Sequence, residues 1–267
     1  MKILVTGATG NIGRKVVDHL IALGADDIRA LSNHPERAGL PEGVEVAHGY
    51  LRRVSSLPEA FDGVQRMYLA PVLETITEVV ELAKMAGIER IVDLSGDETT
   101  DWQPIARGVE KFGAEWTHLY AGEFMENTAM WADQIRAAGA VREPYPESAN
   151  SPIAMDDIAR VAATVLTQDG HDGIAYPLTG PETLTRAERL RQLGVALGRD
   201  LSFVTESREE TLDRLTLSMG DFAEFYVEGL AAMVDNPQQS TTAVADLTGR
   251  PATTFAEWAA ANADLFR

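Results

Sequence analysis

The sequence predicts an α/β fold: a doubly wound parallel sheet with helices on both faces, followed by a small, mostly helical C-terminal lobe. Short apolar runs alternate with amphipathic stretches up to Gly180-Pro181, and the pattern then becomes mostly helical. A length of 267 residues suits one large core with a small second lobe. We expect a core at 1–180 and a lid-like lobe at 181–267, with 122–152 contributing to a ligand cleft.

The elements follow from apolar periodicity and from glycine and proline positions. The predicted strands are 3–5, 28–32, 44–48, 65–70, 90–95, 116–120, 174–179 and a short one at 201–205. The predicted helices are 11–24, 74–86, 123–138, 156–166, 185–197, 209–233 and one that begins at Phe255. Three prolines within 141–152 predict a loop there.

A glycine-rich turn follows the first strand directly. Its sequence is Gly7-Ala8-Thr9-Gly10-Asn11-Ile12-Gly13, and a helix opens there. The first glycine permits the tight turn, the second lets backbone approach a pyrophosphate, and the third lets the helix lie close on the strand. Backbone amides at the helix start then face the anion. The placement predicts a Rossmann-type dinucleotide site.

Composition excludes several classes of function. The chain has no cysteine, so thiolate catalysis, disulfides and thiolate metal sites are ruled out, and its five scattered histidines predict no metal site. The formal net charge of −18 disfavours nucleic acid as a partner. We expect no membrane span and no signal peptide, hence a cytoplasmic protein whose oligomeric state is left open.

Several segments resemble the NmrA-like group of atypical short-chain dehydrogenases. They are VTGATGNIG, RALSNHPERAGLPEGVEVAHG, GVQRMYLAP, GIERIVDLS, GEFMEN, SPIAMDDIARVAATVL and YPLTGPETLT, which cover nearly the whole chain. The resemblance implies a Rossmann core, a small C-terminal lobe, and a cleft where a nicotinamide cofactor meets an aromatic or quinone-like ligand. It does not fix the reaction, because the group includes quinone reductases, aryl ether reductases, polyketide-tailoring enzymes and NADP-sensing regulators.

The cofactor implied is NADP or NAD. The candidate residues to bind it follow four predicted strands: Gly7, Thr9, Gly10, Asn11, Ile12, Gly13, Ser32, Asn33, Arg37, Tyr50, Leu51, Ala70 and Pro71. Three segments depart from the family pattern. Asn33 stands where NADPH-preferring relatives have Arg, and Gly49-Tyr50-Leu51 stands where Gly-Asp-Leu is usual. The third is Leu119-Tyr120-Ala121-Gly122, where relatives often have Leu-Arg-Pro-Gly. Because the dinucleotide is an anion and the chain has a net negative charge, cationic side chains must gather at the cofactor site. We expect them at Arg37, Arg52 and Arg53.

The usual acid/base machinery of short-chain dehydrogenases is missing. None of the four lysines follows a tyrosine by four residues, and Trp102 stands where aryl ether reductases have their lysine. The candidate catalytic residues are Ser95, at the end of the fifth strand, and His118 and Tyr120, on one face of the sixth. A structural role for His118 in the core and a capping role for Ser95 stay open alternatives.

An apolar pocket for a flat ligand is expected from aromatic and polar residues at helical spacing. Its candidate members are Trp102, Phe124, Asn127, Trp131, Phe222 and Tyr226. Three hypotheses follow: an NAD(P)H-dependent oxidoreductase acting on a quinone or polycyclic aromatic, polyketide-like small molecule; a cofactor-independent oxygenase of phenolic or anthrone-type substrates; and a non-catalytic NADP-sensing regulator. We rank the oxidoreductase first.

Overall fold

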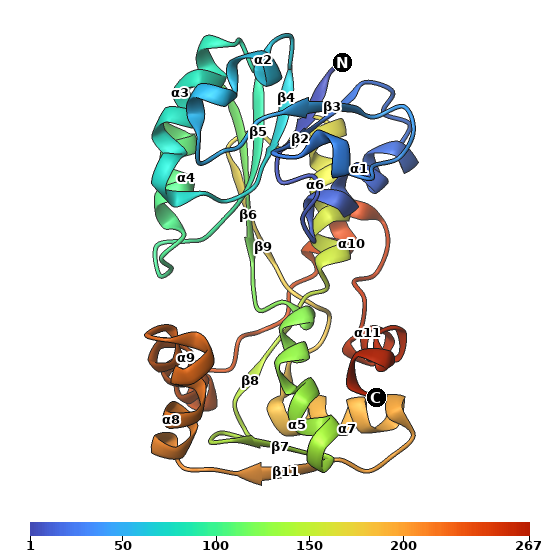
Figure 1. Cartoon of the computed structure of the whole chain (residues 1–267), viewed down its shortest axis with the longest axis vertical. Coiled ribbons are helices and arrows are strands. Elements are labelled where there is room, and N and C mark those ends of the chain that lie inside the picture. The colour runs from blue at the N-terminus through green and yellow to red at the C-terminus, as the bar shows by residue number, and fades with distance from the viewer. The chain divides into compact units, whose positions relative to one another are not determined.

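The computed structural model describes residues 1–267 and divides into two compact units (Figure 1). Unit 1 comprises Met1–Ala121, Met155–Leu178 and Ala243–Arg250, and unit 2 comprises Gly122–Ala154, Thr179–Thr242 and Pro251–Arg267. The chain therefore passes between the units several times, whereas the sequence suggested one boundary at residue 180. Contacts within each unit, which sequence periodicity does not report, decide this division.

Unit 1 contains a seven-stranded sheet in the order β3-β2-β1-β4-β5-β6-β9, and every neighbouring pair is parallel. The strands are β1 (Ile3–Val5), β2 (Ile28–Ser32), β3 (Glu45–His48), β4 (Arg66–Leu69), β5 (Arg90–Ser95), β6 (Glu115–Ala121) and β9 (Ile174–Leu178). The order reverses between β1 and β4, which is the switch point where ligands bind in doubly wound sheets. The predicted Rossmann-type fold is confirmed.

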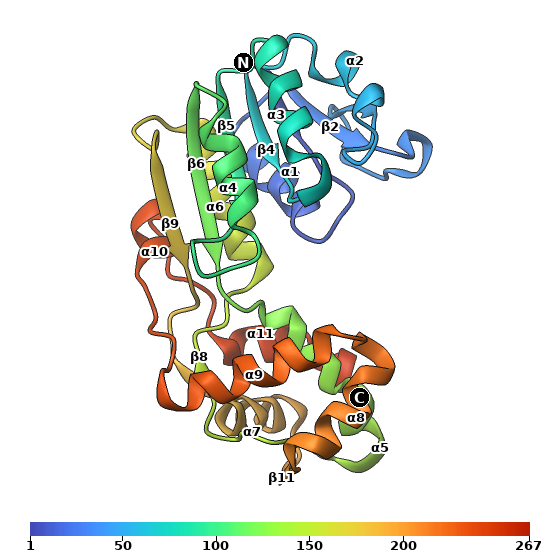
Figure 2. The same cartoon turned by 90° about the vertical axis from the view of Figure 1, so that its left-hand side faces the viewer.

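Helices cover both faces of this sheet (Figure 2). On one side lie α1 (Gly13–Ala22) and α6 (Met155–Thr167), which pack on each other, and α10 (Ala243–Thr248) packs on α6. On the other, at the left in Figure 1, lie α2 (Pro58–Phe61), α3 (Ile76–Met85) and α4 (Gln103–Glu110). Unit 1 also contains short 3-10 turns at Pro35–Arg37, Val54–Ser56 and Leu73–Thr75. Helices α2, α4 and α10 were not predicted.

Unit 2 is built from two small sheets and several helices. Strand β7 (Ala140–Glu143) pairs in parallel with β11 (Ser202–Thr205), and β8 (Ala149–Asn150) pairs antiparallel with β10 (Leu184–Thr185). The helices are η4 (Met125–Trp131), α5 (Ala132–Ala138), α7 (Arg186–Leu197), α8 (Arg208–Met219), α9 (Phe222–Asp235), α11 (Phe255–Ala261) and η5 (Ala263–Phe266). Helices α5, α7 and α11 share a core that includes Ile135, Leu193 and Phe255, whereas α8 and α9 pack on each other through Leu215 and Val227.

Three local predictions in unit 2 are wrong. The expected loop at 141–152 contains β7 and β8, which exist because segments more than 30 residues away pair with them. The expected single helix at 209–233 is two helices, α8 and α9, separated at Gly220, whose φ of +58° is a left-handed conformation that ends a helix. The expected helix at 123–138 begins as the 3-10 helix η4 and is α-helical only from Ala132.

No helix combines the length and the apolar character needed to cross a bilayer.

Candidate functional site

In the glycine turn at the end of β1, backbone atoms approach one another so closely that there is no room for a side chain. Gly7 has φ +61°, and its carbonyl accepts a hydrogen bond of 2.9 Å from the Gly10 amide. A Cβ on Gly13 would lie 2.2 Å from the Gly7 carbonyl oxygen, so only glycine fits where α1 crosses the turn. A Cβ on Gly10 would lie 3.2 Å from the same oxygen. The tight turn predicted at Gly7 and the close helix packing predicted at Gly13 agree with this geometry.

The start of α1 suits an anion. No side chain caps it and its first turn has no acidic residue, so the amides at its first positions are not engaged by a carboxylate or hydroxyl. Thr9, Gly10 and Asn11 are exposed beside it, with Ile12 as the cap residue. A pyrophosphate fits such a cradle, because the amides and the helix dipole both favour negative charge.

The tip of β2 lies next to this turn in the sheet. The buried Ser32 hydroxyl accepts a hydrogen bond of 3.1 Å from the His34 amide, so it braces the turn that follows the strand. Asn33 is half-buried, and the Arg37 side chain is 81% exposed with only Glu36 beside it, 3.7 Å away. The Asn33 amide lies 3.5 Å from Nε2 of the exposed His34, so Asn33, His34 and Arg37 are the polar side chains at this strand tip.

The tip of β3 carries Tyr50, Leu51 and two arginines. The Gly49 amide donates to the Ser32 carbonyl at 2.9 Å, which joins this segment to the tip of β2. Tyr50 is 40% exposed, whereas Leu51 is buried in the core between the sheet and α3. Arg52 forms an ion pair with Glu74 at 2.5 Å, and Arg53 is exposed with no acidic partner.

The tip of β4 is the fourth strand end at this edge of the sheet, after those of β1, β2 and β3. The Ala70 amide donates to the Thr6 hydroxyl at 2.8 Å, and a Cβ on Gly7 would lie 3.0 Å from the Ala70 Cβ. Pro71 follows directly and is half-buried. Because parallel strands end at the same edge of a sheet, the structure brings together the candidate cofactor residues at the carboxyl ends of β3, β2, β1 and β4.

A buried acid–imidazole pair links β5 and β6. Asp93 and His118 are direct register partners, both with no exposed surface, and His118 Nδ1 lies 2.7 Å from Asp93 Oδ2. The His118 ring stacks between Trp116, at a centroid distance of 4.2 Å, and Tyr120, at 5.8 Å. The sequence analysis missed Asp93. An aspartate within the apolar run of a central strand was the available signal, because such a group needs a partner.

Ser95 and Tyr120 lie at the carboxyl ends of these two strands and are register partners. Ser95 is 8% exposed, and its buried hydroxyl has no hydrogen-bond partner, so it caps neither a helix nor a turn. Tyr120 is half-buried, and the pKa of its phenol is raised by burial and by nearby carboxylates, of which Asp93 has the largest effect. Asp97 caps its own turn through the Thr99 amide at 2.9 Å.

The pKa of Asp93 is raised above its ordinary value. Burial is the dominant cause, and the hydrogen bond and charge of His118 oppose it, as does the nearby Ser95 hydroxyl. Asp93 Oδ1 and His118 Nε2 are buried without a hydrogen-bond partner, at opposite ends of the pair. The nearest charged group to Nε2 is Glu110 of α4, whose Oε1 lies 3.8 Å away. Burial therefore outweighs the contact with His118 in setting the pKa of Asp93.

The six candidate pocket residues are divided between the units. Trp102 lies in unit 1, at the start of α4, and is 48% exposed. The other five lie in unit 2, where Phe124 is half-buried, Asn127 is exposed and Phe222 is 55% exposed. Trp131 is buried in the core of that unit, and its indole N–H donates to Glu143 at 2.7 Å.

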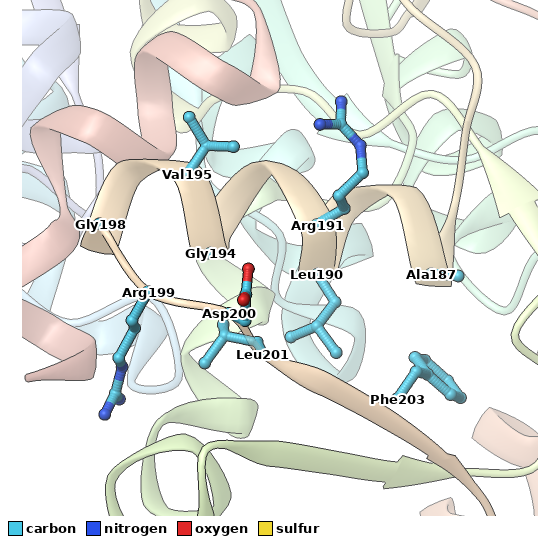
Figure 3. A pocket seen from close by; sticks show the side chains of 10 residues that line it. All are labelled: Ala187, Leu190, Arg191, Gly194, Val195, Gly198, Arg199, Asp200, Leu201 and Phe203. Carbon is cyan, nitrogen blue, oxygen red and sulfur yellow. The ribbon is translucent and has the colours of Figure 1, made fainter.

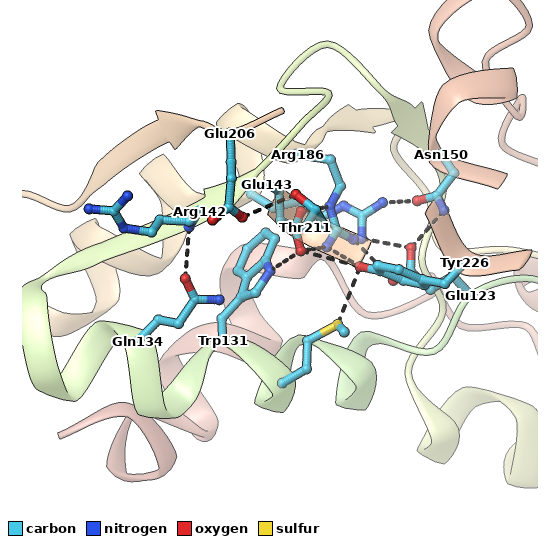
Figure 4. Close-up of polar contacts among 12 residues, drawn as sticks. Glu123, Trp131, Gln134, Arg142, Glu143, Asn150, Arg186, Glu206, Thr211 and Tyr226 are labelled. Carbon is cyan, nitrogen blue, oxygen red and sulfur yellow. Dashed lines mark hydrogen bonds and ion pairs between the residues drawn. The ribbon is translucent and has the colours of Figure 1, made fainter. Parts of the chain in front are cut away.

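Trp131 and Tyr226 meet around one buried guanidinium (Figure 4). Arg186 donates to Glu143 at 2.9 and 2.7 Å and to the Tyr226 hydroxyl at 2.7 Å, and it lies 4.6 Å above the Trp131 ring. These partners fix both aromatic side chains in place. Sequence periodicity cannot reveal this network because its members come from η4, β7, α7 and α9.

A shallow pocket of about 470 Å³ also lies in unit 2, along α7 and the segment that leads into β11 (Figure 3). Its lining includes Leu190, Val195, Leu201 and Phe203, and it contains none of the residues predicted for ligand binding. Two exposed arginines line it: Arg191 pairs with Glu188 at 2.7 Å, and Arg199 donates to the Ile135 carbonyl at 3.2 Å. We assign no role to it.

Comparison with known proteins supports the nucleotide site. Residues 7–169 match a protein family described as NAD(P)H-binding. The chain is 34% identical to the (4-alkanoyl-5-oxo-2,5-dihydrofuran-3-yl)methyl phosphate reductase of Streptomyces griseus subsp. griseus, over 99% of both chains. It is 33% identical to the NAD(P)H azoreductase of Xenophilus azovorans, again over 99% of both.

The same fold occurs in a solved structure, the triphenylmethane reductase of Citrobacter sp. complexed with NADP(H). The TM-score is 0.86, with 23% identity over 98% of this chain and 100% of the other. The family match begins at Gly7, the first glycine of the turn described above, and spans all of the strand tips that form the nucleotide edge. The chain is therefore a member of the NAD(P)H-binding family, within the NmrA-like group of atypical short-chain dehydrogenases.

Proposed function

We propose that this protein is an NAD(P)H-dependent reductase of small conjugated acceptors, quinones and related aromatic compounds among them. The observation that carries the proposal is the glycine turn, where a Cβ on Gly13 would strike the Gly7 carbonyl at 2.2 Å and the start of α1 has no side-chain cap. That cradle fits a dinucleotide pyrophosphate. Two relatives at 33% and 34% identity that are named as reductases support the same activity.

The chain would hold the cofactor along one sheet edge. The turn residues bind the pyrophosphate through backbone amides, while Asn33, Arg37 and Arg53 supply polar and cationic groups at the tips of β2 and β3. Tyr50, with 40% of its surface exposed, offers a ring face to the adenine. When bound, the nicotinamide supplies a hydride.

The chain lacks the Tyr-Lys pair of ordinary short-chain dehydrogenases, so proton supply must come from elsewhere. Ser95 and Tyr120 are the hydroxyl groups at the ends of β5 and β6, and the Ser95 hydroxyl lies near the Asp93 carboxyl. We assign Ser95 as the proton donor to the reduced substrate, with Tyr120 beside it. A raised pKa keeps the Tyr120 phenol protonated at neutral pH.

The names of the two relatives suggest a chemical feature that their substrates share. One is named for an acyl-substituted oxo-dihydrofuran and the other for azo compounds. Both contain a conjugated double bond, and hydride addition to such a bond, as to a quinone, leaves a delocalised anion that requires little acid catalysis. This chemistry matches a site with a hydroxyl donor and no lysine, and it favours conjugated acceptors over simple ketones.

Nucleotide binding and turnover test the proposal in sequence. NADPH or NADH at saturating concentration should raise the thermal midpoint by several degrees, because ligand binding to the native state alone shifts unfolding. Oxidation of the cofactor at 340 nm should then require an added quinone, azo dye or unsaturated lactone. Binding without turnover on any of the three would indicate a cofactor sensor, and turnover of a phenol with oxygen but no nucleotide would indicate the oxygenase.

A further inference from the structure

The segment that follows β5 carries an excess of negative charge. Residues 91–106 contain four acidic residues and no lysine or arginine. Asp93 is buried within β5, and the other three, Asp97, Glu98 and Asp101, lie in the exposed loop between β5 and α4. No ion pair neutralises these three loop carboxylates. The end of β5 is therefore a region of negative potential.

A glycine lets this loop fold back against the end of β5. Gly96 follows Ser95 directly and is buried, and a Cβ on it would lie 3.0 Å from the Trp102 Cβ. The Asp97 carboxylate holds the loop in this shape, because its Oδ1 accepts hydrogen bonds from the Thr99 amide at 2.9 Å and the Thr99 hydroxyl at 2.6 Å. Trp102 is 48% exposed. The fold of the loop therefore places an exposed indole near a candidate proton donor.

The same strand end presents two hydroxyl groups. Ser95 is 8% exposed, its Oγ has no hydrogen-bond partner, and its register partner Tyr120 is half-buried. Burial raises the pKa of the Tyr120 phenol most, and nearby carboxylates, Asp97 and Glu98 of the loop among them, raise it further. An unsatisfied buried hydroxyl, an exposed indole and a surplus of negative charge therefore meet at one strand end.

Charge is divided along this carboxyl edge of the sheet. Arg37 and Arg53, both exposed, follow β2 and β3, whereas the acidic loop follows β5. Phosphate groups are attracted to the first position and repelled from the second. The end of β5 therefore suits a ligand without negative charge, and an exposed indole beside carboxylates suits a cation in particular.

We propose that the end of β5 is the acceptor site and that it selects cationic conjugated ring systems, of which an N-alkyl acridinium is an example. The carboxylates of Asp97, Glu98 and Asp101 attract the positive charge. The Trp102 indole stacks on the flat ring, because tryptophan binds cations best among the aromatic side chains. This inference rests on the reductase function proposed above, since it names the chemical class of the acceptor.

Hydride addition to a cation requires no acid. One C–H bond of the reduced cofactor breaks, one C–H bond of the acceptor forms, and the positive charge passes from the acceptor to the oxidised cofactor. The product is neutral, so Ser95 gives up no proton. A neutral quinone instead becomes an anion, which the carboxylates beside it destabilise until a proton is supplied.

The residues that the chain lacks agree with this class of acceptor. A site without the Tyr-Lys pair of ordinary short-chain dehydrogenases reduces most readily an acceptor whose product needs no proton. Reduction also removes the charge that holds the acceptor beside the loop. The neutral product is therefore bound more weakly than the cation, which favours its release.

Binding in the absence of nucleotide tests the site directly. The probe is 10-methylacridinium, a flat fluorescent cation, and fluorescence titration gives its Kd. The triple variant Asp97→Asn/Glu98→Gln/Asp101→Asn keeps the size and the acceptor oxygens of the side chains but removes three charges. We expect its Kd to be about fivefold higher at physiological ionic strength, with the difference shrinking as salt is added.

A matched variant controls for the net charge of the chain. Asp26→Asn/Glu59→Gln/Asp62→Asn removes three exposed charges that precede β2 and β4, at the other edge of the sheet, and should leave Kd within about twofold. Trp102→Leu should raise Kd several-fold, and Trp102→Phe should raise it less. Equal Kd values for the two triple variants, or no binding at millimolar concentration, would overturn the proposal.

Turnover separates this inference from the proposed function. The rate enhancement over the uncatalysed reaction with NADPH should be larger for 10-methylacridinium than for neutral 1,4-naphthoquinone. Ser95→Ala should lower kcat with the quinone about tenfold more than with the cation, because only the quinone takes a proton. Quinone reduction without a larger enhancement for the cation refutes the inference alone. No turnover of either acceptor, beside the expected binding of the cation, refutes the proposed function instead.

Discussion

Glu143 holds the guanidinium of Arg186 through two hydrogen bonds, from Nε at 2.9 Å and from Nη2 at 2.7 Å, with both side chains almost wholly buried. The pair lies at the centre of unit 2, where Trp131 and Tyr226 also contact it. It joins β7 to α7, two elements 43 residues apart in the chain. The aromatic residues that the sequence suggested as pocket walls are thus held by a buried charge network.

Removing one member of this pair should destabilise the protein strongly. Arg186→Met leaves the Glu143 carboxylate buried without its cation, which costs about 3–5 kcal/mol in free energy of unfolding. Chemical denaturation followed by far-UV circular dichroism measures the change. Arg191→Met is the control on the same helix, because its exposed ion pair with Glu188 should contribute nothing measurable. Equal midpoints for the two variants would contradict this account.

Glu123 should make unit 2 sensitive to acid. Burial alone would raise the pKa of this carboxyl, but Arg189, Arg186 and the Asn150 amide outweigh it and lower the pKa to about 2. The folded-state pKa lies below the unfolded value, so the contribution is fully present above about pH 5 and is lost as pH falls toward 2. Unfolding free energy measured between pH 6 and 3 should decline, and Glu123→Gln should flatten that decline while lowering stability at pH 7.

Asp93 should affect stability with the opposite sign. Its pKa is raised in the folded state, so this carboxyl costs stability once the pH exceeds the unfolded value. Asp93→Asn should therefore leave the protein at least as stable at pH 7, because the amide oxygen of the new side chain still accepts a hydrogen bond from His118 Nδ1–H. A thermal midpoint several degrees lower in the variant would show that the pair stabilises the fold.

Gly13 should be intolerant of even one added methyl group. Gly13→Ala places Cβ 2.2 Å from the Gly7 carbonyl, which must push α1 off the turn and weaken NADPH binding at least tenfold. Fluorescence titration gives the Kd. Gly229→Ala is the matched control, since this glycine lies within α9 with open space around it, and the change should raise stability by about 0.5–1 kcal/mol.

Neighbouring arginines should differ in their effect on cofactor choice. Arg53 has no acidic partner, whereas Arg52 is paired with Glu74. If NADPH is the cofactor, Arg53→Ala should raise its Kd several-fold with little effect on NADH, because a 2′-phosphate needs a cation. Arg52→Ala should change both affinities less. Parallel titrations at two salt concentrations check this, and an equal loss for both cofactors would place Arg53 at the shared pyrophosphate.

The sequence by itself determined the parallel sheet of unit 1 and the edge of that sheet at which the candidate nucleotide-binding residues lie. Strand–helix alternation and the glycine turn are local patterns, so residues 3–13 alone predict a strand, a turn and a helix start that the structure confirms. The strand tips at Ser32, Tyr50 and Ala70 followed from the same periodicity, because parallel strands end at one edge. Local sequence patterns were therefore enough to predict the parts of the candidate site that the backbone forms, namely the glycine turn and the strand ends.

Only the tertiary structure decided which polar side chains are paired. Asp93 and His118 are 25 residues apart and meet because β5 and β6 are neighbours in one register, and Glu143 meets Arg186 across 43 residues. The break between α8 and α9 and the strands within 141–152 also depend on distant partners or on a single backbone angle. A buried charge is tolerated only beside its partner, and sequence separation does not reveal which residue that partner is.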